Sequence, residues 1–239
     1  MINDKCELIL RDLYSYDVVS AFPSIMQSQN YDFQNIDLTN KEERNIFIGK
    51  EQRNNKYLSS FLNQSISSLV DYYLTINKID SDDIIFRQKD GFILRKPLVI
   101  SDQFIEMKLR SFISLMFVSL DRTRMLYFDD FGNLVVKGVK YYYKKLDDIY
   151  NMMYNLNFYN LKILFQQLAY IKNKVLTCDD ISFYGIDIGD GKYVFLTDNG
   201  TLTVRDFDFV DMKSIDRLKY FNVYFKPFID SVFLEVLRK

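Results

Sequence analysis

Alternation of polar and apolar residues marks two stretches of the chain as strands. The first runs from Leu8 to Ile25, where we expect the strand to end in a turn at Pro23. The second is a hairpin over Asp83–Leu94, two apolar runs of β-forming residues around a polar centre that ends in Asp90 and Gly91. An Asp-Gly pair is typical of a hairpin turn, so the pattern predicts that Asp90 lies at or beside the turn.

The segment between these strands is predicted to be helical. Thr39 and Glu42 have the spacing of a capping box, and apolar residues recur at helical spacing from Lys41 to Tyr73 without a proline. We expect two helices here, joined near Gly49.

The rest of the chain continues the mixture of strands and helices. We expect strands, a long helix, short strands joined by glycine turns and a helical tail, in this order: Phe112–Leu120 and Arg124–Val139 with a turn at 131–133, Leu146–Lys174, a stretch from Ile181 with turns at Gly189, Gly191 and Gly200, and Ser214–Leu237. With 239 residues, 48% of them hydrophobic, the chain is long enough to bury a substantial core.

Composition removes several classes of chemistry. There is no histidine, which excludes His-based general bases, Ser-His-Asp triads and His-ligated zinc. Chemistry must therefore rest on carboxylates, amines, guanidinium groups, hydroxyls or metal ions. The two cysteines, Cys6 and Cys178, lie far apart, and no apolar run approaches the roughly 18 to 20 residues that span a bilayer. We expect a soluble protein of a reducing compartment, the cytoplasm, with no membrane partner.

Charge gives no global reason to bind nucleic acid, because the formal net charge is -1. Two segments are locally basic. Residues 41–56 hold five basic residues against three glutamates, and residues 132–146 hold no acid but seven basic or aromatic side chains, Lys137, Lys140, Tyr141, Tyr142, Tyr143, Lys144 and Lys145. Such runs are most often solvated faces, so they indicate a DNA-binding surface only if the fold brings them together.

The strongest motif is the end of the first strand, Asp-Val-Val-Ser-Ala-Phe-Pro-Ser-Ile at residues 17–25. It resembles the metal-binding palm motif of family B DNA polymerases, Asp-x-x-Ser-Leu-Tyr-Pro-Ser-Ile. Asp17, Ser20 and Pro23 fall on this motif without a gap, and Phe22 stands where tyrosine is usual. The resemblance implies that Ser20 and Phe22 contact the incoming nucleotide, with the ring of Phe22 blocking a ribose 2'-hydroxyl.

The predicted hairpin carries a second match. Residues 86–91 resemble the palm motif Tyr-Gly-Asp-Thr-Asp-Ser of the same family; Asp90 falls on the second aspartate, and Gln88 replaces the first. The resemblance implies that Asp17 and Asp90 are the catalytic residues and bind two Mg²⁺ ions, which Mn²⁺ can replace, with the backbone carbonyl of Val18 completing one site.

A third match lies between the two palm motifs. Residues 50–57 are similar to the fingers motif Lys-x-x-x-Asn-Ser-x-Tyr-Gly. On one continuous helix Lys50, Asn54 and Tyr57 share a face, which presents an ammonium group to the triphosphate and a ring to the nascent base pair. Arg44, about two turns earlier, is placed to add a second phosphate contact. These four residues complete the expected nucleotide-binding set.

Two later segments resemble parts of the family that grip DNA. Residues 121–124 resemble a Lys-Lys-Arg-Tyr segment and residues 132–139 a Lys-Gly-Val segment, which implies contacts with the primer-template backbone by Arg122, Arg124, Lys137 and Gly138. Residues 214–228 resemble the Ile-Asp-x-x-x-Leu/Tyr-Phe segment and trailing proline of phage replicative polymerases.

The short matches occur in the order of the family and together cover almost the whole chain. They imply an α+β fold: an antiparallel-sheet polymerase palm (1–26 and 83–139), short helical, reduced fingers (27–82) and a mixed α/β thumb (140–239). The implied activity is template-directed transfer of nucleotidyl groups from dNTPs to a primer 3'-hydroxyl on DNA. The bias towards Lys, Asn, Ile, Tyr and Phe suggests an AT-rich viral genome.

The partners of such a chain stay open. Only 24 residues separate Ile25 from Lys50, and we expect no exonuclease domain before residues 1–12. We expect either a minimal polymerase or the C-terminal part of a split enzyme whose second chain carries the N-terminal and exonuclease domains. One alternative is a catalytically silent, polymerase-derived subunit that binds DNA or a partner, which Gln88 and the short fingers favour. Another is a primase or terminal transferase.

Overall fold

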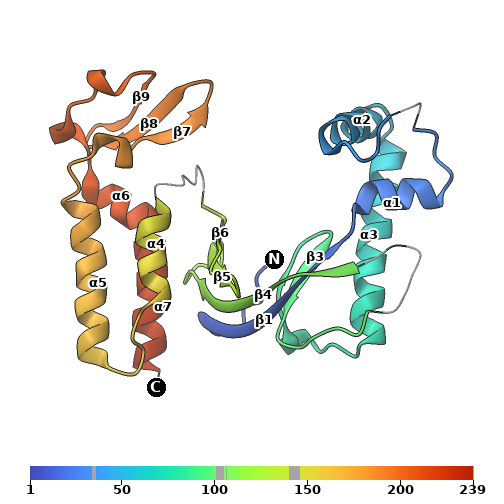
Figure 1. The fold of residues 1–239 in the computed structure, drawn as a ribbon, viewed down its shortest axis with the longest axis horizontal. Coiled ribbons are helices and arrows are strands. Elements are labelled where there is room, and N and C mark those ends of the chain that lie inside the picture. The colour runs from blue at the N-terminus through green and yellow to red at the C-terminus, as the bar shows by residue number, and fades with distance from the viewer. Residues whose placement is uncertain (34–35, 101–104, 106, 140–145, 239) are drawn as a thin grey trace. The chain divides into compact units, whose positions relative to one another are not determined.

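The computed structural model describes residues 1–33, 36–100, 105, 107–139 and 146–238. The chain forms two compact units (Figure 1): unit 1 comprises Met1–Cys6 and Asp12–Ile113, and unit 2 comprises Glu7–Arg11 and Ser114–Lys239. The division into palm, fingers and thumb, whose boundaries differ from these, stays a prediction.

The elements of unit 1 are β1 (Ile9–Val18), α1 (Ala21–Ser28), α2 (Lys41–Asn54), α3 (Lys56–Ile76), the 3₁₀ turn η1 (Ser81–Asp83), β2 (Ile84–Arg87), β3 (Gly91–Leu94) and β4 (Met107–Val118), where β1 and β4 continue into unit 2. The remaining elements belong to unit 2: β5 (Met125–Asp129), β6 (Leu134–Lys137), α4 (Asp147–Tyr154), α5 (Leu161–Leu176), η3 (Ile181–Phe183), β7 (Ile186–Gly189), β8 (Lys192–Thr197), β9 (Gly200–Val204), η4 (Phe207–Phe209), η5 (Met212–Ser214), α6 (Arg217–Tyr224) and α7 (Lys226–Leu237).

Two sheets are present among the described residues. The larger has the strand order β2-β3-β1-β4-β5-β6 and the smaller the order β7-β8-β9. Strand β3 pairs antiparallel with both β1 and β2, and β5 pairs antiparallel with β6. The prediction of an α+β chain with an antiparallel sheet is therefore confirmed, as are the hairpin at 83–94 and the short strands after Ile181.

The core of unit 1 is built on one face of α3. The residues buried on this face recur every three or four positions, as a single apolar stripe requires: Leu62, Ile66, Val70, Tyr73 and Leu74. Helices α1 and α2 both pack against α3 (Figure 1). Apolar side chains of β1 and β3 join the same cluster. This packing fixes α1 and α2 beside the ends of β1 and β3.

Strand β1 does not end in a turn at Pro23, as the alternation had predicted. It ends at Val18, and Pro23 lies in the first turn of α1. Proline is tolerated there because the first helical N–H groups have no partner within the helix. The predicted capping residue is also displaced by one position. Asn40, not Thr39, caps α2, and its side chain accepts hydrogen bonds from the backbone N–H groups of Glu42 and Glu43.

The break between the two helices of the 41–73 segment lies at Asn55, and the predicted joint near Gly49 is wrong. Gly49 lies inside α2. Asn55 adopts an extended conformation (φ -129°, ψ 97°), and its side-chain oxygen accepts a hydrogen bond from the backbone N–H of Leu58, 3.1 Å away. Asparagine is among the strongest N-capping residues, so α3 begins anew after it.

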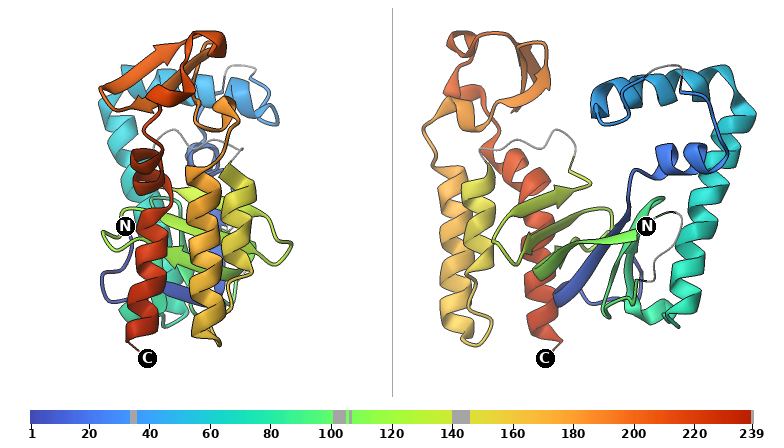
Figure 2. Two further views of the ribbon diagram at one scale, coloured as in Figure 1. Left: turned by 90° about the vertical axis from the view of Figure 1, so that its left-hand side faces the viewer. Right: turned by 45° about the vertical axis from the view of Figure 1, so that its right-hand side comes forward.

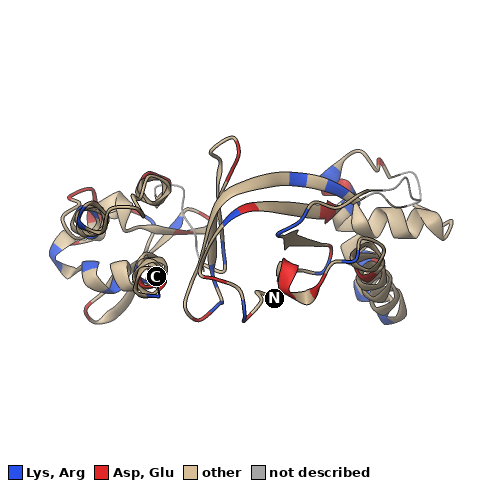
Figure 3. Ribbon diagram, turned by 90° about the horizontal axis from the view of Figure 1, so that it is seen from below, with Lys and Arg blue, Asp and Glu red and all other residues tan. Residues whose placement is uncertain are grey.

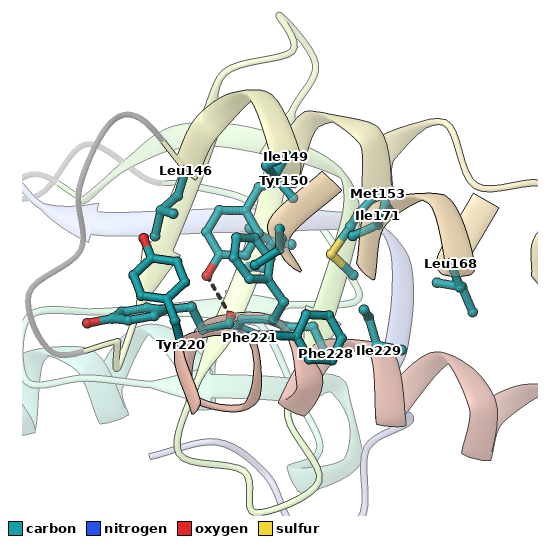
Figure 4. Close-up of a cluster of buried hydrophobic side chains, with 14 of the residues drawn as sticks. Leu146, Ile149, Tyr150, Met153, Leu168, Ile171, Tyr220, Phe221, Phe228 and Ile229 are labelled. Atoms are coloured by element: carbon teal, nitrogen blue, oxygen red, sulfur yellow. Dashed lines mark hydrogen bonds between the residues drawn. The ribbon is translucent and has the colours of Figure 1, made fainter. Parts of the chain in front are cut away.

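Unit 2 packs its helices around a cluster of buried aliphatic and aromatic side chains (Figure 4). Helices α4 and α5 lie side by side (Figures 1 and 2), and α5 also contacts α6. The single helix predicted over 146–174 is therefore wrong: α4 ends at Tyr154, and Asn160 caps α5 with a bond from the N–H of Ile163. In the cluster, the buried hydroxyl of Tyr150 donates to the carbonyl oxygen of Tyr224 at 2.7 Å.

Two buried tyrosines link the segment that precedes β7, residues 181–184, to helices α5 and α6. The hydroxyl of Tyr184 donates to the carbonyl oxygen of Val175 at 2.6 Å, and that of Tyr220 to the carbonyl oxygen of Phe183 at 2.9 Å. Burial raises the pKa of Tyr184 to about 12 and that of Tyr220 well above its usual value, because the charged phenolate is disfavoured away from water. Both hydroxyls therefore stay neutral at ordinary pH.

Charged residues are spread over both units. Figure 3 shows Lys and Arg interspersed with Asp and Glu, in keeping with a formal net charge of -1. Within the part of the chain that the structure describes, no helix combines the length and apolar character that a membrane span requires. A functional site must therefore be built from particular residues and not from overall charge.

Candidate active site

The two candidate catalytic aspartates lie on neighbouring strands of unit 1. Strands β1 and β3 pair with Asp17 opposite Gly91, and the backbone N–H of Val18 donates to the carbonyl oxygen of Asp90 at 2.7 Å. The N–H of Gln88 donates to the carbonyl oxygen of Gly91 at 3.0 Å and closes the hairpin turn. The expected adjacency of the two strands is thus confirmed, while the catalytic roles of Asp17 and Asp90 stay a prediction.

Gly91 lets the carboxylate of Asp17 lie directly against strand β3. A methyl group added at Gly91 would come within 2.5 Å of Asp17 Oδ1 and 3.2 Å of Asp17 Cα, and would overlap the carbonyl oxygen of Tyr16. Any side chain at this position would therefore displace either the carboxylate or the strand. In the sequence, the pattern around Gly91 indicates only a turn residue.

Both oxygens of the Asp17 carboxylate accept hydrogen bonds from side chains of the same unit. The amide nitrogen of Gln88 donates to Oδ1 at 3.2 Å, and Arg110 on β4 donates from Nη1 to Oδ2 at 2.7 Å. The side chain of Asp17 is 20% exposed and that of Arg110 54% exposed. Sequence reasoning missed Arg110, because it belongs to no motif and only the strand arrangement brings it to Asp17.

A cleft of about 310 Å³ opens beside Asp90 at the start of α1. It is lined by residues of α1, α2 and the β2–β3 turn: Ser20, Ala21, Phe22, Pro23, Arg44, Asn45, Ile48, Gly49, Gln52 and Asp90. Three predicted nucleotide-binding residues, Ser20, Phe22 and Arg44, are therefore brought together with a predicted catalytic aspartate. The first N–H groups of a helix such as α1 carry a partial positive charge that favours anions.

Arg44 contributes the permanent positive charge of this cleft. Its Nη1 donates to the carbonyl oxygen of Leu38 at 3.1 Å and to the hydroxyl of Ser20 at 3.4 Å. Its Nε is buried and has no hydrogen-bond partner among the described residues. A guanidinium group that lines a cleft beside a helix N-terminus is suited to a phosphate.

Phe22 is held at the cleft by a cation from the hairpin turn. The ammonium group of Lys89 lies 4.9 Å from the centroid of the Phe22 ring, within the range of a cation–π interaction. The side chain of Phe22 is only half-buried, so the ring is available to a ligand in the cleft. Its proposed contact with a sugar stays a prediction.

The predicted fingers motif is not placed on one helix face. Lys50 and Asn54 belong to α2, whereas Tyr57 lies in the first turn of α3, after the break at Asn55. The argument that one continuous helix aligns these three residues is therefore wrong. All three side chains are exposed, Tyr57 to 89%, and none of them lines the cleft. Their contact with a nucleotide stays a prediction without support from this arrangement.

The four predicted DNA-binding residues gather in unit 2 at one end of the β5–β6 hairpin. Met125, which follows Arg124, pairs with Lys137. Gly138 has a φ of +77°, and a methyl group there would come within 3.0 Å of Arg124 Cα, so only glycine fits. Arg124 also donates from its guanidinium group to the carbonyl oxygen of Val223, and Arg122 has a φ of +54°. The lysines and tyrosines at 140–145 lie outside the described residues.

The donor set suits a hard divalent cation only in part. The carboxylates of Asp17 and Asp90 and the carbonyl of Val18 are the oxygen ligands that Mg²⁺ prefers. Among the described residues, however, no group of three or more His, Cys, Asp or Glu side chains could hold a metal ion. Cation binding by Asp17 would require its ion pair with Arg110 to open.

Comparison with known proteins leaves the family of the chain open. No protein-family model matches the chain, and no curated protein matches it. Among solved structures, the chain is similar to the family B DNA polymerase from the hyperthermophilic archaeon Pyrobaculum calidifontis, with a TM-score of 0.47 and 11% identity over 99% of this chain. The chain spans 46% of the length of that polymerase. At this level of similarity the comparison carries no functional conclusion, and the site must be argued from its own residues.

Proposed function

We propose that this chain is the core of a template-directed DNA polymerase, which transfers a nucleotidyl group from a dNTP to a primer 3'-hydroxyl. The observation that carries the proposal is the pairing of β1 with β3. It brings Asp17 and Asp90 to the same end of two neighbouring strands, next to a cleft that holds Arg44, Ser20 and Phe22. Such a site combines carboxylates with an anion-binding cleft, as nucleotidyl transfer requires.

The residues of the chain have separate tasks in this proposal. Arg44 and the N-terminus of α1 bind the triphosphate, and Arg44 neutralises charge that develops on the leaving pyrophosphate. Phe22 packs against the sugar and excludes a ribose 2'-hydroxyl. Asp17 and Asp90 would hold Mg²⁺, which would supply activation of the primer hydroxyl and stabilisation of charge on the phosphoryl oxygens. The protein supplies alignment and charge and forms no covalent bond with the substrate.

DNA contacts and partners belong to the same proposal. Arg122, Arg124, Lys137 and Gly138 lie together at the end of the β5–β6 hairpin, which supports a role in holding the primer-template backbone. Three further parts of the proposal are supported by the sequence resemblance alone. These are a second chain with N-terminal and exonuclease domains, a viral origin, and a location in the host cytoplasm.

Primer extension tests the proposal. Purified protein is given a labelled primer on a DNA template with dNTPs and Mg²⁺ or Mn²⁺, and wild type is compared with Asp17→Asn and Asp90→Asn. Asp82→Asn is the matched control, because it removes an exposed aspartate of unit 1 outside the cleft. We expect extension by wild type and by the control and none by the two site variants. Equal extension by all four proteins would refute the assignment of both aspartates.

A second candidate function is a catalytically silent subunit that binds DNA or a partner chain. The observation that favours it is the engagement of both Asp17 oxygens by Gln88 and Arg110, because Gln88 stands where the family has a further carboxylate. This function predicts DNA binding by wild type without extension under any cation.

A further inference from the structure

The ion pair between Arg110 and Asp17 gives the candidate site an internal positive charge that the sequence motifs do not contain. Arg110 Nη1 lies 2.7 Å from Asp17 Oδ2, and the second oxygen of Asp17 accepts from Gln88. A carboxylate ligand must offer its lone pairs to a metal ion. Here both oxygens already accept hydrogen bonds, one of them from a charged donor.

The fold holds Arg110 in this position through its neighbours on β4. Phe112, two residues along the same strand and therefore on the same face as Arg110, makes an edge-to-face contact with Tyr14 of β1, with ring centroids 5.4 Å apart. Gln88 is fixed separately, by the closed turn of the β2–β3 hairpin. Two independent elements thus converge on one carboxylate.

The charges around the site also oppose the binding of a free cation. Asp17 and Asp90 are opposed by three cations that contact the site or its cleft, namely Arg110, Lys89 and Arg44. Arginine stays charged across the whole working pH range, so its competition with a divalent cation is not removed by pH. A site with this balance attracts an anionic nucleotide more strongly than a free cation.

We propose that Arg110 is a resident counter-ion of Asp17 that competes with divalent cations for this carboxylate and so sets the cation affinity of the site. The inference rests on the proposed function only in taking Asp17 as a cation ligand. Arg110 is thus a positioning residue, which acts through Asp17 and need not touch the substrate. Removing its charge while keeping a hydrogen-bonding side chain frees one oxygen of Asp17 for the cation.

The test is Mn²⁺ binding by the full chain without DNA or nucleotide, followed by electron paramagnetic resonance of free Mn²⁺. Arg110→Gln should bind Mn²⁺ about two- to fivefold more tightly than wild type, the range expected for loss of a partly exposed ion pair. Arg110→Lys keeps the charge and should remain within about twofold of wild type. Lys108→Gln, which removes a charge two residues away on the same strand, is the matched control and should also remain close to wild type.

A double variant tests whether the tighter Mn²⁺ binding depends on Asp17. Arg110→Gln combined with Asp17→Asn should lose the tighter binding, because the ligand itself is gone. The inference is overturned if Arg110→Gln binds no more tightly than Lys108→Gln, if the gain survives Asp17→Asn, or if none of the proteins binds Mn²⁺ at millimolar concentration. Far-UV circular dichroism and the Arg110→Lys protein establish that the variants fold.

The outcome can be separated from that of the proposed function. Tighter Mn²⁺ binding by Arg110→Gln in a protein that never extends a primer would support the role of Arg110 as a counter-ion and refute the proposed polymerase function. If wild-type protein extends a primer but the Arg110→Gln variant has the same Mn²⁺ affinity as wild type, the polymerase function is supported and the role of Arg110 as a counter-ion is refuted.

Discussion

Replacing Gly91 with alanine tests the close approach of β1 and β3 on which the candidate site depends. The added methyl group would come within 2.5 Å of Asp17 Oδ1 and would overlap the backbone carbonyl oxygen of Tyr16. Gly91 is buried, so the methyl group cannot turn towards solvent. A backbone atom cannot move aside as the end of a flexible side chain can, so the two strands must separate or the carboxylate must rotate away.

Two contributions set the size of the effect on stability. Overpacking a well-packed interior typically costs about 1–3 kcal/mol in free energy of unfolding. Separation of the strands would also weaken the hydrogen bond from Val18 N–H to the Asp90 carbonyl, now 2.7 Å long, which is worth about 1 kcal/mol. We therefore expect Gly91→Ala to lower the free energy of unfolding by roughly 2–4 kcal/mol. A shift of about 1 Å at a catalytic group can cost about 100-fold in rate, so extension should fall further than stability explains.

Urea unfolding followed by tyrosine fluorescence and circular dichroism measures the first quantity, and single-nucleotide incorporation under conditions where the variant is folded measures the second. Gly49→Ala is the control for stability. A methyl group at Gly49 meets nothing within 4 Å, and Gly49 lies inside α2, so alanine there should stabilise by roughly 0.5–1 kcal/mol. Wild-type stability and activity in Gly91→Ala would refute the strand geometry described for the site.

Two further predictions concern the cleft and the core of unit 2. Replacing Arg44 with methionine should weaken binding of a fluorescent dNTP at least about tenfold, measured by anisotropy, because a charge-assisted phosphate contact is lost. Arg44→Lys should recover part of the lost affinity. Equal affinity of wild type and both variants would contradict the anion-binding role of Arg44. Burial raises the pKa of Tyr184 to about 12, so its contribution to stability is complete below about pH 10, where the unfolded chain also keeps this hydroxyl neutral, and is lost as the pH rises from 10 towards 12. Between pH 9 and 11.5 the free energy of unfolding of wild type should therefore fall by roughly 1–2 kcal/mol more than that of Tyr184→Phe, and parallel curves would show that this hydroxyl is not buried.

Local signals in the sequence predicted local structure well. The Asp90-Gly91 pair predicted the hairpin, although neither residue adopts the left-handed conformation of a two-residue Asp-Gly turn: the turn spans residues 88–90, and Gly91 begins β3. The break at Asn55 and the helix whose first turn contains Pro23 were missed, although both residues carry a signal: asparagine is a strong N-cap, and proline is common in a first helical turn. Periodicity was given more weight than capping at both places.

Tertiary relations could not be predicted in the same way. The adjacency of Asp17 and Asp90 depends on which strands pair, and spacing along the chain does not determine this. The position of Arg110 depends on a third strand and has no motif of its own. Conversely, the i, i+4, i+7 argument for Lys50 and Tyr57 failed because it assumed a continuous helix that the cap at Asn55 interrupts.

The proposed function requires that the templating base selects the nucleotide incorporated at the site of Asp17 and Asp90. An assay of base selection tests this most directly. Wild-type protein is given four primer-templates that differ only in the first templating base, each with all four dNTPs separately and Mg²⁺, and one incorporation event is measured. The account predicts that each template directs incorporation of its complementary nucleotide, and that Asp17→Asn and Asp90→Asn incorporate none. Incorporation of the same nucleotide on every template, or no incorporation by wild type with either Mg²⁺ or Mn²⁺, would contradict it.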